Sequence, residues 1–281
     1  MDGSNLAEQN PKVKSGPGYL ARTVARKRLE VAECARRTSE GRLRDLAGQV
    51  RRPRPWAKAL RGDGVAVIAE IKRRSPSAGS LDPDVDPATR AEVYARHGAV
   101  AVSVLTDGDF GGELNDLERV ALAIDLPVLR KDFLVDPWQV WESRAAGADA
   151  ALVIVAALGE RELAAVASAA REAGVGLLVE IHDLEEIPRA LALDPEAVGV
   201  NARDLRTLET DADWADRTLA ALRREAAAEI VVVAESGIAS PADVRRARES
   251  GADAVLVGEA LMRAEDPGRR LAELVAAGAA W

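Results

Sequence analysis

One short pattern recurs along most of this chain: a helix ends at a glycine, the chain turns, and an almost entirely apolar strand follows. It is seen in HGAVAVSVL (residues 97–105), AGADAALVIV (146–155) and SGADAVLVGE (250–259). Glycine suits the end of a helix because it readily adopts the left-handed backbone conformation needed there. Strands that are apolar throughout are typical of parallel sheets with both faces covered. The pattern therefore predicts a parallel sheet enclosed by helices.

Eight such strands can be counted from residue 65 onward. They are expected at residues 65–72, 100–106, 126–131, 149–155, 175–181, 196–202, 229–236 and 253–259. Most of the stretches between them have the apolar spacing of an amphipathic helix. These repeats predict the α/β class and a single closed (β/α)8 TIM barrel. A doubly wound open sheet is the alternative, but it would usually use fewer strands, and no GxGxxG motif follows the first one.

The chain before the first strand divides into two parts. Residues 1–18 are rich in Asn, Gly, Ser and Pro and have almost nothing to bury, so we expect them to be disordered. Residues 19–64 carry an apolar stripe, including Leu20, Val24 and Val31, which predicts a helical extension that caps the barrel domain of residues 65–281. The many basic residues of this extension could form a flap that faces an anion, but a solvated helix face is the favoured interpretation, and no catalytic role is assigned to them.

Charge and cysteine content narrow the possible partners. The net charge of −8 disfavours a broad surface for nucleic acid or anionic membranes, although it allows a local basic pocket. One cysteine, Cys34, and two histidines, His97 and His182, cannot form a disulfide framework or a usual zinc site. No apolar run reaches the roughly 18 residues of a membrane span, and the N-terminus lacks the regions of a signal peptide. We therefore expect a cytoplasmic protein that binds no metal.

Ionisable and amide side chains gather at the predicted carboxyl ends of five strands, where the active site of a (β/α)8 barrel lies. They are Glu70, Lys72, Lys131, Glu180, Asn201 and Glu235. Any one of them could simply mark the point where a buried strand meets water. Together, three carboxylates and two lysines at one mouth would perturb one another's protonation, which is the environment that general acid–base catalysis requires.

Glycines after the last two strands indicate a phosphate site. Ser236 and Gly237 follow the seventh strand, and Gly258 follows the eighth. Barrels often bind phosphate through backbone N–H groups of these two loops, although glycine also serves ordinary turns. The polar loop after the first strand, with Ser75 and Ser77, is expected to act as a flexible lid.

The two phenylalanines of the chain both fall in predicted loops at this mouth. Phe110 follows the second strand and Phe133 the third. Core packing and ligand contact explain either position equally well. Together with Leu152 they would form a pocket suited to a flat apolar ring.

The same segments form seven motifs in a fixed order. They are AEIKRRSPSAGSL, AVSVLTDGDFGG, PVLRKDFLVDPWQV, LLVEIHDLEE, GVNARDLRTLETD, VVAESGI and VLVGEALM. From about Tyr19 to the C-terminus, the chain resembles the indole-3-glycerol phosphate synthase family. The resemblance implies a carbon–carbon lyase of tryptophan biosynthesis that closes the ring of 1-(2-carboxyphenylamino)-1-deoxyribulose 5-phosphate. Carbon dioxide and water are released, and no metal or organic cofactor is used.

The resemblance also implies a role for each site residue. Lys131 would be the general acid that protonates the substrate's carbonyl oxygen, Lys72 would hold its carboxylate, and Glu180 would be the general base of the dehydration. The lysines and the substrate hydroxyls would be oriented by Glu70, Asn201 and Glu235. The phosphate subsite would comprise Ser75, Ser236, Gly237, Gly258 and Glu259. The ring pocket would comprise Phe110, Phe133, Leu152, Arg203, Leu205 and Leu256.

Two positions depart from the family pattern. Ala202 stands where many relatives have a second asparagine, and Glu259 stands where some have serine. A carboxylate at position 259 would repel phosphate unless it is turned away.

Two other functions share part of this evidence. One is a barrel lyase or aldolase that forms a Schiff base through Lys131 or Lys72. The other is a catalytically silent barrel that only binds phosphate.

In each case the expected partner is an anionic small molecule, which for the synthase carries both phosphate and carboxylate. Binding to nucleic acid or to a membrane is not expected. A monomer is expected.

Overall fold

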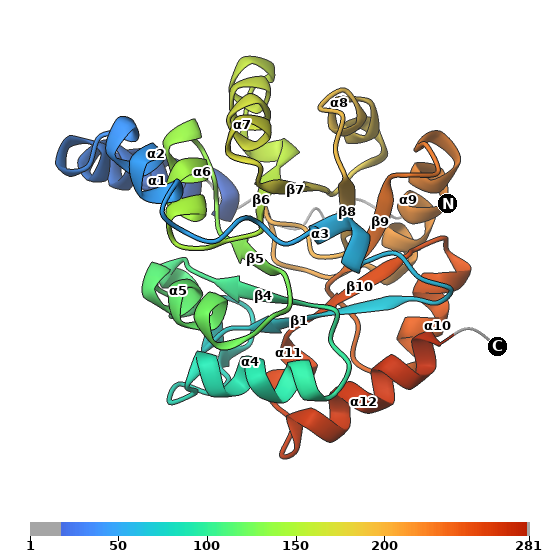
Figure 1. The fold of residues 1–281 in the computed structure, drawn as a ribbon. Helices are drawn as coiled ribbons and strands as arrows, with labels where there is room; N and C mark the ends of the chain where they lie inside the picture. The colour runs from blue at the N-terminus through green and yellow to red at the C-terminus, as the bar shows by residue number, and fades with distance from the viewer. Residues whose placement is uncertain (1–17, 280–281) are drawn as a thin grey trace, which may run out of the picture.

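A closed barrel of parallel strands forms the centre of the molecule, which we describe from a computed structural model covering residues 18–279. The disorder predicted for residues 1–18 therefore falls almost entirely outside the described part. The spatial order of the strands is β1-β10-β9-β8-β7-β6-β5-β4 (Figure 1). They are β1 (Ala66–Ile71), β4 (Ala101–Leu105), β5 (Val128–Lys131), β6 (Ala150–Ile154), β7 (Gly176–Ile181), β8 (Ala197–Asn201), β9 (Val231–Glu235) and β10 (Ala254–Val257). The predicted TIM barrel is confirmed, and each strand lies within its predicted range.

Helices alternate with these strands and cover the outside of the barrel (Figure 1). They are α4 (Pro87–Arg96), α5 (Leu114–Ala123), α6 (Pro137–Ala145), α7 (Glu160–Ala173), α8 (Ile187–Leu191), α9 (Ala212–Glu225), α10 (Pro241–Glu249) and α12 (Pro267–Gly278). The glycines expected after three helices are left-handed, with φ of 94° at Gly98, 89° at Gly147 and 97° at Gly251. A short additional helix, α11 (Glu259–Met262), follows the last strand directly.

Strand side chains alternate between two apolar layers. Ile68, Leu129 and Leu178 belong to the cluster that fills the barrel interior. Val67 and Val153, from the intervening positions, belong to the cluster between the strands and the helices. Because both faces are buried, apolar residues stand at nearly every strand position. The polar side chains at the strand ends are therefore exceptions that need a local explanation.

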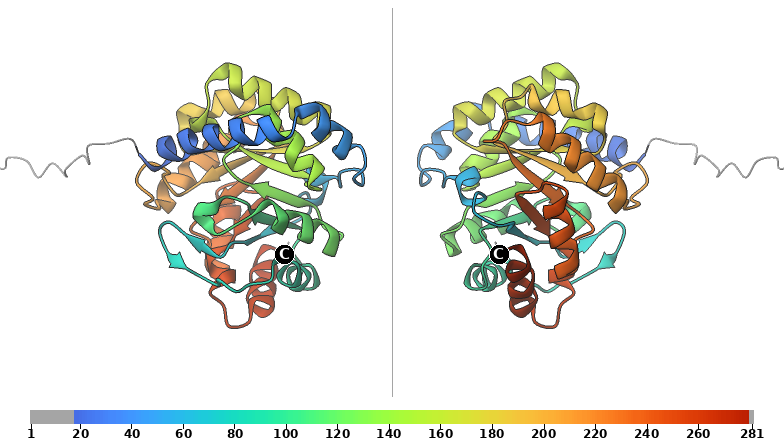
Figure 2. Two further views of the ribbon diagram at one scale, coloured as in Figure 1. Left: turned by 90° about the vertical axis from the view of Figure 1, so that its left-hand side faces the viewer. Right: turned by 90° about the vertical axis from the view of Figure 1, so that its right-hand side faces the viewer.

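The N-terminal extension covers both ends of this barrel. It contains α1 (Tyr19–Arg37), α2 (Glu40–Ala47) and α3 (Trp56–Ala59). Trp56 and Leu60 join the apolar cluster of the barrel interior, close to Gly176 at the start of β7. Helix α1 lies across the opposite end, where the backbone N–H of Leu20 donates to Leu205 O at 3.1 Å (Figure 2).

The loop after β1 has regular structure. It forms an antiparallel hairpin of β2 (Arg74–Ser75) and β3 (Gly79–Ser80), which stands away from the barrel in Figure 2. The predicted lid is thus a short hairpin beside the site. Among residues 18–279, no helix has the length and apolar character needed to cross a membrane.

Candidate active site

A pocket of about 950 Å³, counted with the space at its open mouth, lies at the carboxyl ends of the strands. Every residue that the sequence predicted for the site lines it: Glu70, Lys72, Ser75, Phe110, Lys131, Phe133, Leu152, Glu180, Asn201, Arg203, Leu205, Glu235, Ser236, Gly237, Leu256, Gly258 and Glu259. The strands and the loops that follow them deliver these groups, so the barrel topology alone brings together residues up to 189 positions apart (259 minus 70). The roles of the individual residues remain predictions.

Lys131 stands at the centre of the charged groups. Its Nζ lies 3.1 Å from Glu180 Oε2 and 3.3 Å from Glu235 Oε2. Burial alone would favour the neutral amine, but the neighbouring acidic groups outweigh it and raise the pKa of Lys131, with Glu180 contributing most, followed by Glu235 and Glu70. The side chain is therefore an ammonium ion at neutral pH and can donate a proton.

The two carboxyl groups beside Lys131 differ in protonation. Burial favours the neutral acid at Glu180, but Lys131, His182 and a hydrogen bond from Asn201 outweigh burial and lower the pKa of Glu180. For Glu235, burial and the charge of Glu180 prevail over Lys131 and raise the pKa to about 8. Near pH 7, Glu180 is thus a carboxylate and Glu235 is largely a neutral acid. A pair of carboxyl groups divided in this way can supply one base and one hydrogen-bond donor.

Lys72 forms a second, separate pair. Its Nζ donates to Glu70 Oε1 at 2.6 Å. A Cβ atom on Gly258 would lie 2.2 Å from the same Glu70 oxygen and 3.0 Å from Lys72 Nζ. The glycine at position 258 therefore makes room for this ion pair, a reason that the sequence did not reveal. Gly199 does the same for Glu235, since a Cβ atom there would lie 2.0 Å from Glu235 Oε1.

The loops proposed for phosphate have an unusual backbone. Ser236 and Gly237 are both left-handed, with φ of 65° and 72°. For Ser236 this conformation is uncommon, and such residues concentrate at ligand-binding sites. On the neighbouring loop, Glu259 is turned toward Arg263, whose Nε donates to Glu259 Oε1 at 3.1 Å. The carboxylate is thus partly neutralised within its own helix.

The apolar side of the pocket is built from aromatic rings. Phe110 and Phe133 lie with ring centroids 6.5 Å apart, and Tyr19 meets Phe133 edge to face at 6.2 Å. Tyr19 also donates a hydrogen bond to Asp109 Oδ2 at 3.1 Å. Sequence reasoning missed Tyr19, because nothing in the local pattern of the extension indicates that its first helical residue reaches the site.

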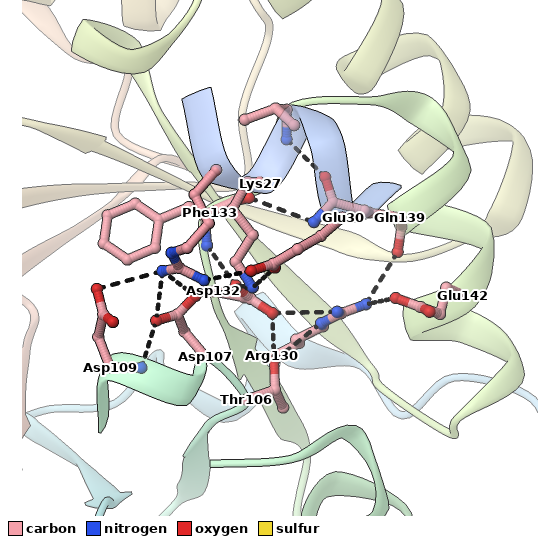
Figure 3. A network of polar contacts seen from close by, with 12 residues as sticks. Lys27, Glu30, Thr106, Asp107, Asp109, Arg130, Asp132, Phe133, Gln139 and Glu142 are labelled. Carbon is pink, nitrogen blue, oxygen red and sulfur yellow. Dashed lines mark hydrogen bonds and ion pairs between the residues drawn. The ribbon is translucent and has the colours of Figure 1, made fainter. Parts of the chain in front are cut away.

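A buried polar network joins helix α1 to the loops that carry Phe110 and Phe133 (Figure 3). Lys27 Nζ lies 2.7 Å from Asp107 Oδ2 and 2.9 Å from Asp132 Oδ1. Arg26 also binds Asp107, and Arg130 binds Asp132 at 3.1 Å. Despite burial, Arg130 and Lys27 lower the pKa of Asp132 to about 2.

The interpretation of the basic extension as a solvated face is therefore wrong at these positions. Lys27 is 6% exposed, and its charge is satisfied by carboxylates of the barrel. The sequence could not separate Lys27 from its exposed basic neighbours, because its acidic partners lie 80 and 105 residues further along the chain (107 − 27 and 132 − 27). The network fixes α1 over the mouth of the barrel.

The remaining predicted groups have clear local partners. Ser75 Oγ accepts a hydrogen bond from the backbone N–H of Ala78 at 3.0 Å and lies 3.3 Å from Ser77 Oγ. Arg203 donates to Leu208 O at 2.9 Å, which holds the guanidinium along the loop after β8. Within residues 18–279, no cluster of histidine, cysteine and acidic side chains is suited to hold a metal ion.

Comparison with known proteins gives the same result as the motifs. The family model for indole-3-glycerol phosphate synthase matches residues 20–274. The chain belongs to the indole-3-glycerol phosphate synthase family. It is 52% identical over 217 residues to the indole-3-glycerol phosphate synthase of Kineococcus radiotolerans, covering 77% of this chain and 78% of that one. It is 46% identical over 252 residues to indole-3-glycerol phosphate synthase 1 of Streptomyces coelicolor, covering 89% and 92% of the two chains.

Solved structures agree at the level of the fold. A 3-hexulose-6-phosphate synthase superimposes with a TM-score of 0.61 at 19% identity, covering 76% of this chain and all of the other. A thiamine phosphate pyrophosphorylase from Pyrococcus furiosus gives a TM-score of 0.57 at 18% identity, covering 78% and 96%. At such low sequence identities these similarities support the barrel fold alone. The function of the present chain must be argued from its own site residues.

Proposed function

We propose that this chain closes the ring of 1-(2-carboxyphenylamino)-1-deoxyribulose 5-phosphate to form indole-3-glycerol phosphate, carbon dioxide and water. The observation that carries the proposal is Lys131, an ammonium ion 3.1 Å from one carboxyl group and 3.3 Å from another at the base of the pocket. The family match supports the same reaction.

In the first step, Lys131 protonates the substrate's carbonyl oxygen while the new carbon–carbon bond forms. Glu180 and Glu235 hold the ammonium group in place, so that proton donation needs no reorganisation of the site. The ring pocket of Phe110 and Phe133 holds the aromatic ring against the reacting carbon. Correct placement is required because bond formation at the ring carbon temporarily disrupts its aromaticity.

Lys72 binds the substrate carboxylate, and Glu70 positions the lysine through the hydrogen bond of 2.6 Å. The carboxylate leaves as carbon dioxide after the ring has closed. In the dehydration that follows, Glu180 accepts a proton from carbon, and Lys72 is well placed to protonate the departing hydroxyl. Asn201 and Glu235 orient Glu180, Lys131 and the hydroxyl groups of the sugar chain.

The phosphate group is bound at the opposite side of the mouth. Ser75, Ser236, Gly237 and Gly258 supply hydroxyl and N–H donors there, next to the start of α11. Glu259 belongs to the same subsite but takes no part in binding phosphate, because it faces Arg263. The hairpin β2–β3, which lies beside the site, closes over the phosphate when substrate binds.

The Schiff-base alternative is disfavoured by the state of Lys131. A lysine nucleophile must be a free amine, usually with a lowered pKa, whereas the carboxylates here raise the pKa of Lys131. A silent phosphate-binding barrel would not explain why the acid and base groups are buried together.

We also propose that the protein is a monomer in which residues 19–64 form a capping extension of the barrel domain. A cytoplasmic location is proposed because the unpaired, exposed Cys34 suits a reducing compartment.

The direct test is the appearance of indole fluorescence when the purified protein is mixed with the carboxyphenylamino substrate. The proposal requires a fluorescent product formed with one equivalent of carbon dioxide. Borohydride treatment in the presence of substrate tests the alternative, since a reduced adduct on Lys131 or Lys72 would replace acid catalysis by covalent catalysis.

A further inference from the structure

Lys27 of the N-terminal extension bridges the two loops that carry the phenylalanines of the ring pocket. Its Nζ lies 2.7 Å from Asp107 Oδ2 and 2.9 Å from Asp132 Oδ1 (Figure 3). Asp107 precedes Phe110 by three residues, and Asp132 directly precedes Phe133. One ammonium group thus ties together two carboxylates, each of which belongs to a loop with one of the two rings.

Each aspartate also fixes the backbone that leads to its phenylalanine. Asp107 Oδ1 accepts from the backbone N–H of Asp109 at 2.8 Å and so caps the 3-10 helix of Gly108–Phe110. Asp132 Oδ1 accepts from the backbone N–H of Phe133 itself at 2.8 Å. Caps of this kind hold the start of a helix or turn in one conformation. A shift of either carboxylate would therefore move the ring that follows it.

The two carboxylates are buried and would repel each other without a shared cation. Asp107 is 0% exposed and Asp132 is 3% exposed, at a depth where water screens charge poorly. Arg26 binds Asp107 and Arg130 binds Asp132, but these two cations each serve one aspartate. Lys27 contacts both, so its ammonium group sets how closely the two loops approach.

We infer that Lys27 is a positioning residue that sets the spacing of Phe110 and Phe133, and thereby the selectivity of the site for the substrate's aromatic ring. The two ring centroids are 6.5 Å apart, and the ring of Tyr19, from the same helix as Lys27, packs edge to face on Phe133. The inference rests on the proposed function, in which this pocket holds the aromatic ring against the reacting carbon. Lys27 itself does not line the pocket and acts only through the two loops.

A substrate with one additional methyl group on its aromatic ring, para to the amino nitrogen, tests the spacing. One extra carbon in an apolar pocket changes kcat/KM by about 10- to 200-fold, so wild type should convert the methylated substrate at least about tenfold less efficiently than the unsubstituted one. Lys27→Met keeps the length of the side chain but removes the charge, and the loops can then separate. The preference should fall to about threefold or less, while KM for the unsubstituted substrate rises.

The ratio of kcat/KM for the two substrates separates positioning from stability. A partly folded variant loses activity toward both substrates by the same factor, so its ratio keeps the wild-type value. Lys27→Met combined with Asp107→Asn removes one uncompensated buried charge and should recover stability. The loops still lack their bridge, so the ratio should stay low, and this variant carries the test if Lys27→Met does not fold. The matched control is Lys58→Met, exposed on α3 at the opposite end of the barrel, which should keep the wild-type ratio.

Three results would overturn the inference. They are equal kcat/KM of wild type for the two substrates, a ratio in Lys27→Met within about twofold of wild type, and a double variant that regains the wild-type ratio together with its stability. The last result would identify a purely structural role for Lys27. A wild-type protein that does not convert the unsubstituted substrate would instead refute the proposed function, so the two failures are distinguishable.

Discussion

Gly199→Ala should disable the site without disturbing the barrel. Gly199 lies in the middle of β8, and a Cβ atom there would lie 2.0 Å from Glu235 Oε1 and 3.0 Å from its Cδ. Carbon and oxygen atoms cannot approach so closely, so the carboxyl group must retreat by more than about 1 Å. Glu235 Oε2 is 3.3 Å from Lys131 Nζ, and a shift of this size breaks or redirects that contact.

The expected result is a fall in kcat of about 10²-fold with little change in KM. A misplacement of about 1 Å at a catalytic group costs rate on this scale. The loss appears in kcat because Glu235 orients the proton donor, whereas the carboxylate and phosphate of the substrate bind elsewhere. Overpacking should cost about 1–3 kcal/mol of stability, which a barrel of this size tolerates.

Two companion variants make the result specific. Gly62→Ala is the matched control, because a Cβ atom there meets no heavy atom within 4 Å, and it should keep the wild-type rate. Adding Glu235→Asp to Gly199→Ala shortens the acid by one methylene and should recover part of the lost rate. Stopped-flow or steady-state indole fluorescence measures all of them. A Gly199→Ala protein with kcat within about twofold of wild type would refute the reasoning.

Three further predictions concern stability and binding. Lys27→Met should lower the free energy of unfolding by about 3 kcal/mol, because Asp107 and Asp132 lose a shared buried cation. The control Lys58→Met, on the exposed face of α3, should have little effect. Chemical denaturation measures both variants, and equal unfolding midpoints would contradict the account. The pKa of Glu235 is raised from 4.5 to about 8, so the stability of the wild-type protein relative to Glu235→Gln should fall as pH rises between these values and then level off. Melting temperatures of both proteins at pH 5 and pH 9 test this trend. A stability difference that grows in favour of wild type at the higher pH would contradict it. Inorganic phosphate should compete with the substrate, and non-competitive inhibition would place the phosphate subsite elsewhere.

The sequence was sufficient for the barrel because the repeated pattern is local. Each strand is defined by its own apolar run, and each joint by a glycine such as Gly98 or Gly251. The residues at the strand ends could be listed for the same reason, since a (β/α)8 topology places all carboxyl ends at one mouth. Lys131 and Glu180 could therefore be named as site residues without any interatomic distance.

Other features depend on contacts between distant segments and left no local signal. Lys27 looks like any basic residue on a helix until Asp107 and Asp132 are brought beside it. Gly199 looks like an ordinary strand glycine, yet it makes room for the Glu235 carboxyl group 36 residues later (235 − 199). Such features could be found only from side-chain positions.

The central claim is that Lys131 donates the proton that allows ring closure, and the most direct measurement is the kinetics of Lys131→Met. Methionine has a similar length but no charge. Since the ammonium group acts mainly in the transition state, kcat should fall by about 10² to 10⁴, while KM stays within about threefold of wild type. A fall in kcat of less than about tenfold, in a protein whose circular dichroism matches wild type, would contradict the assignment of Lys131 as the general acid.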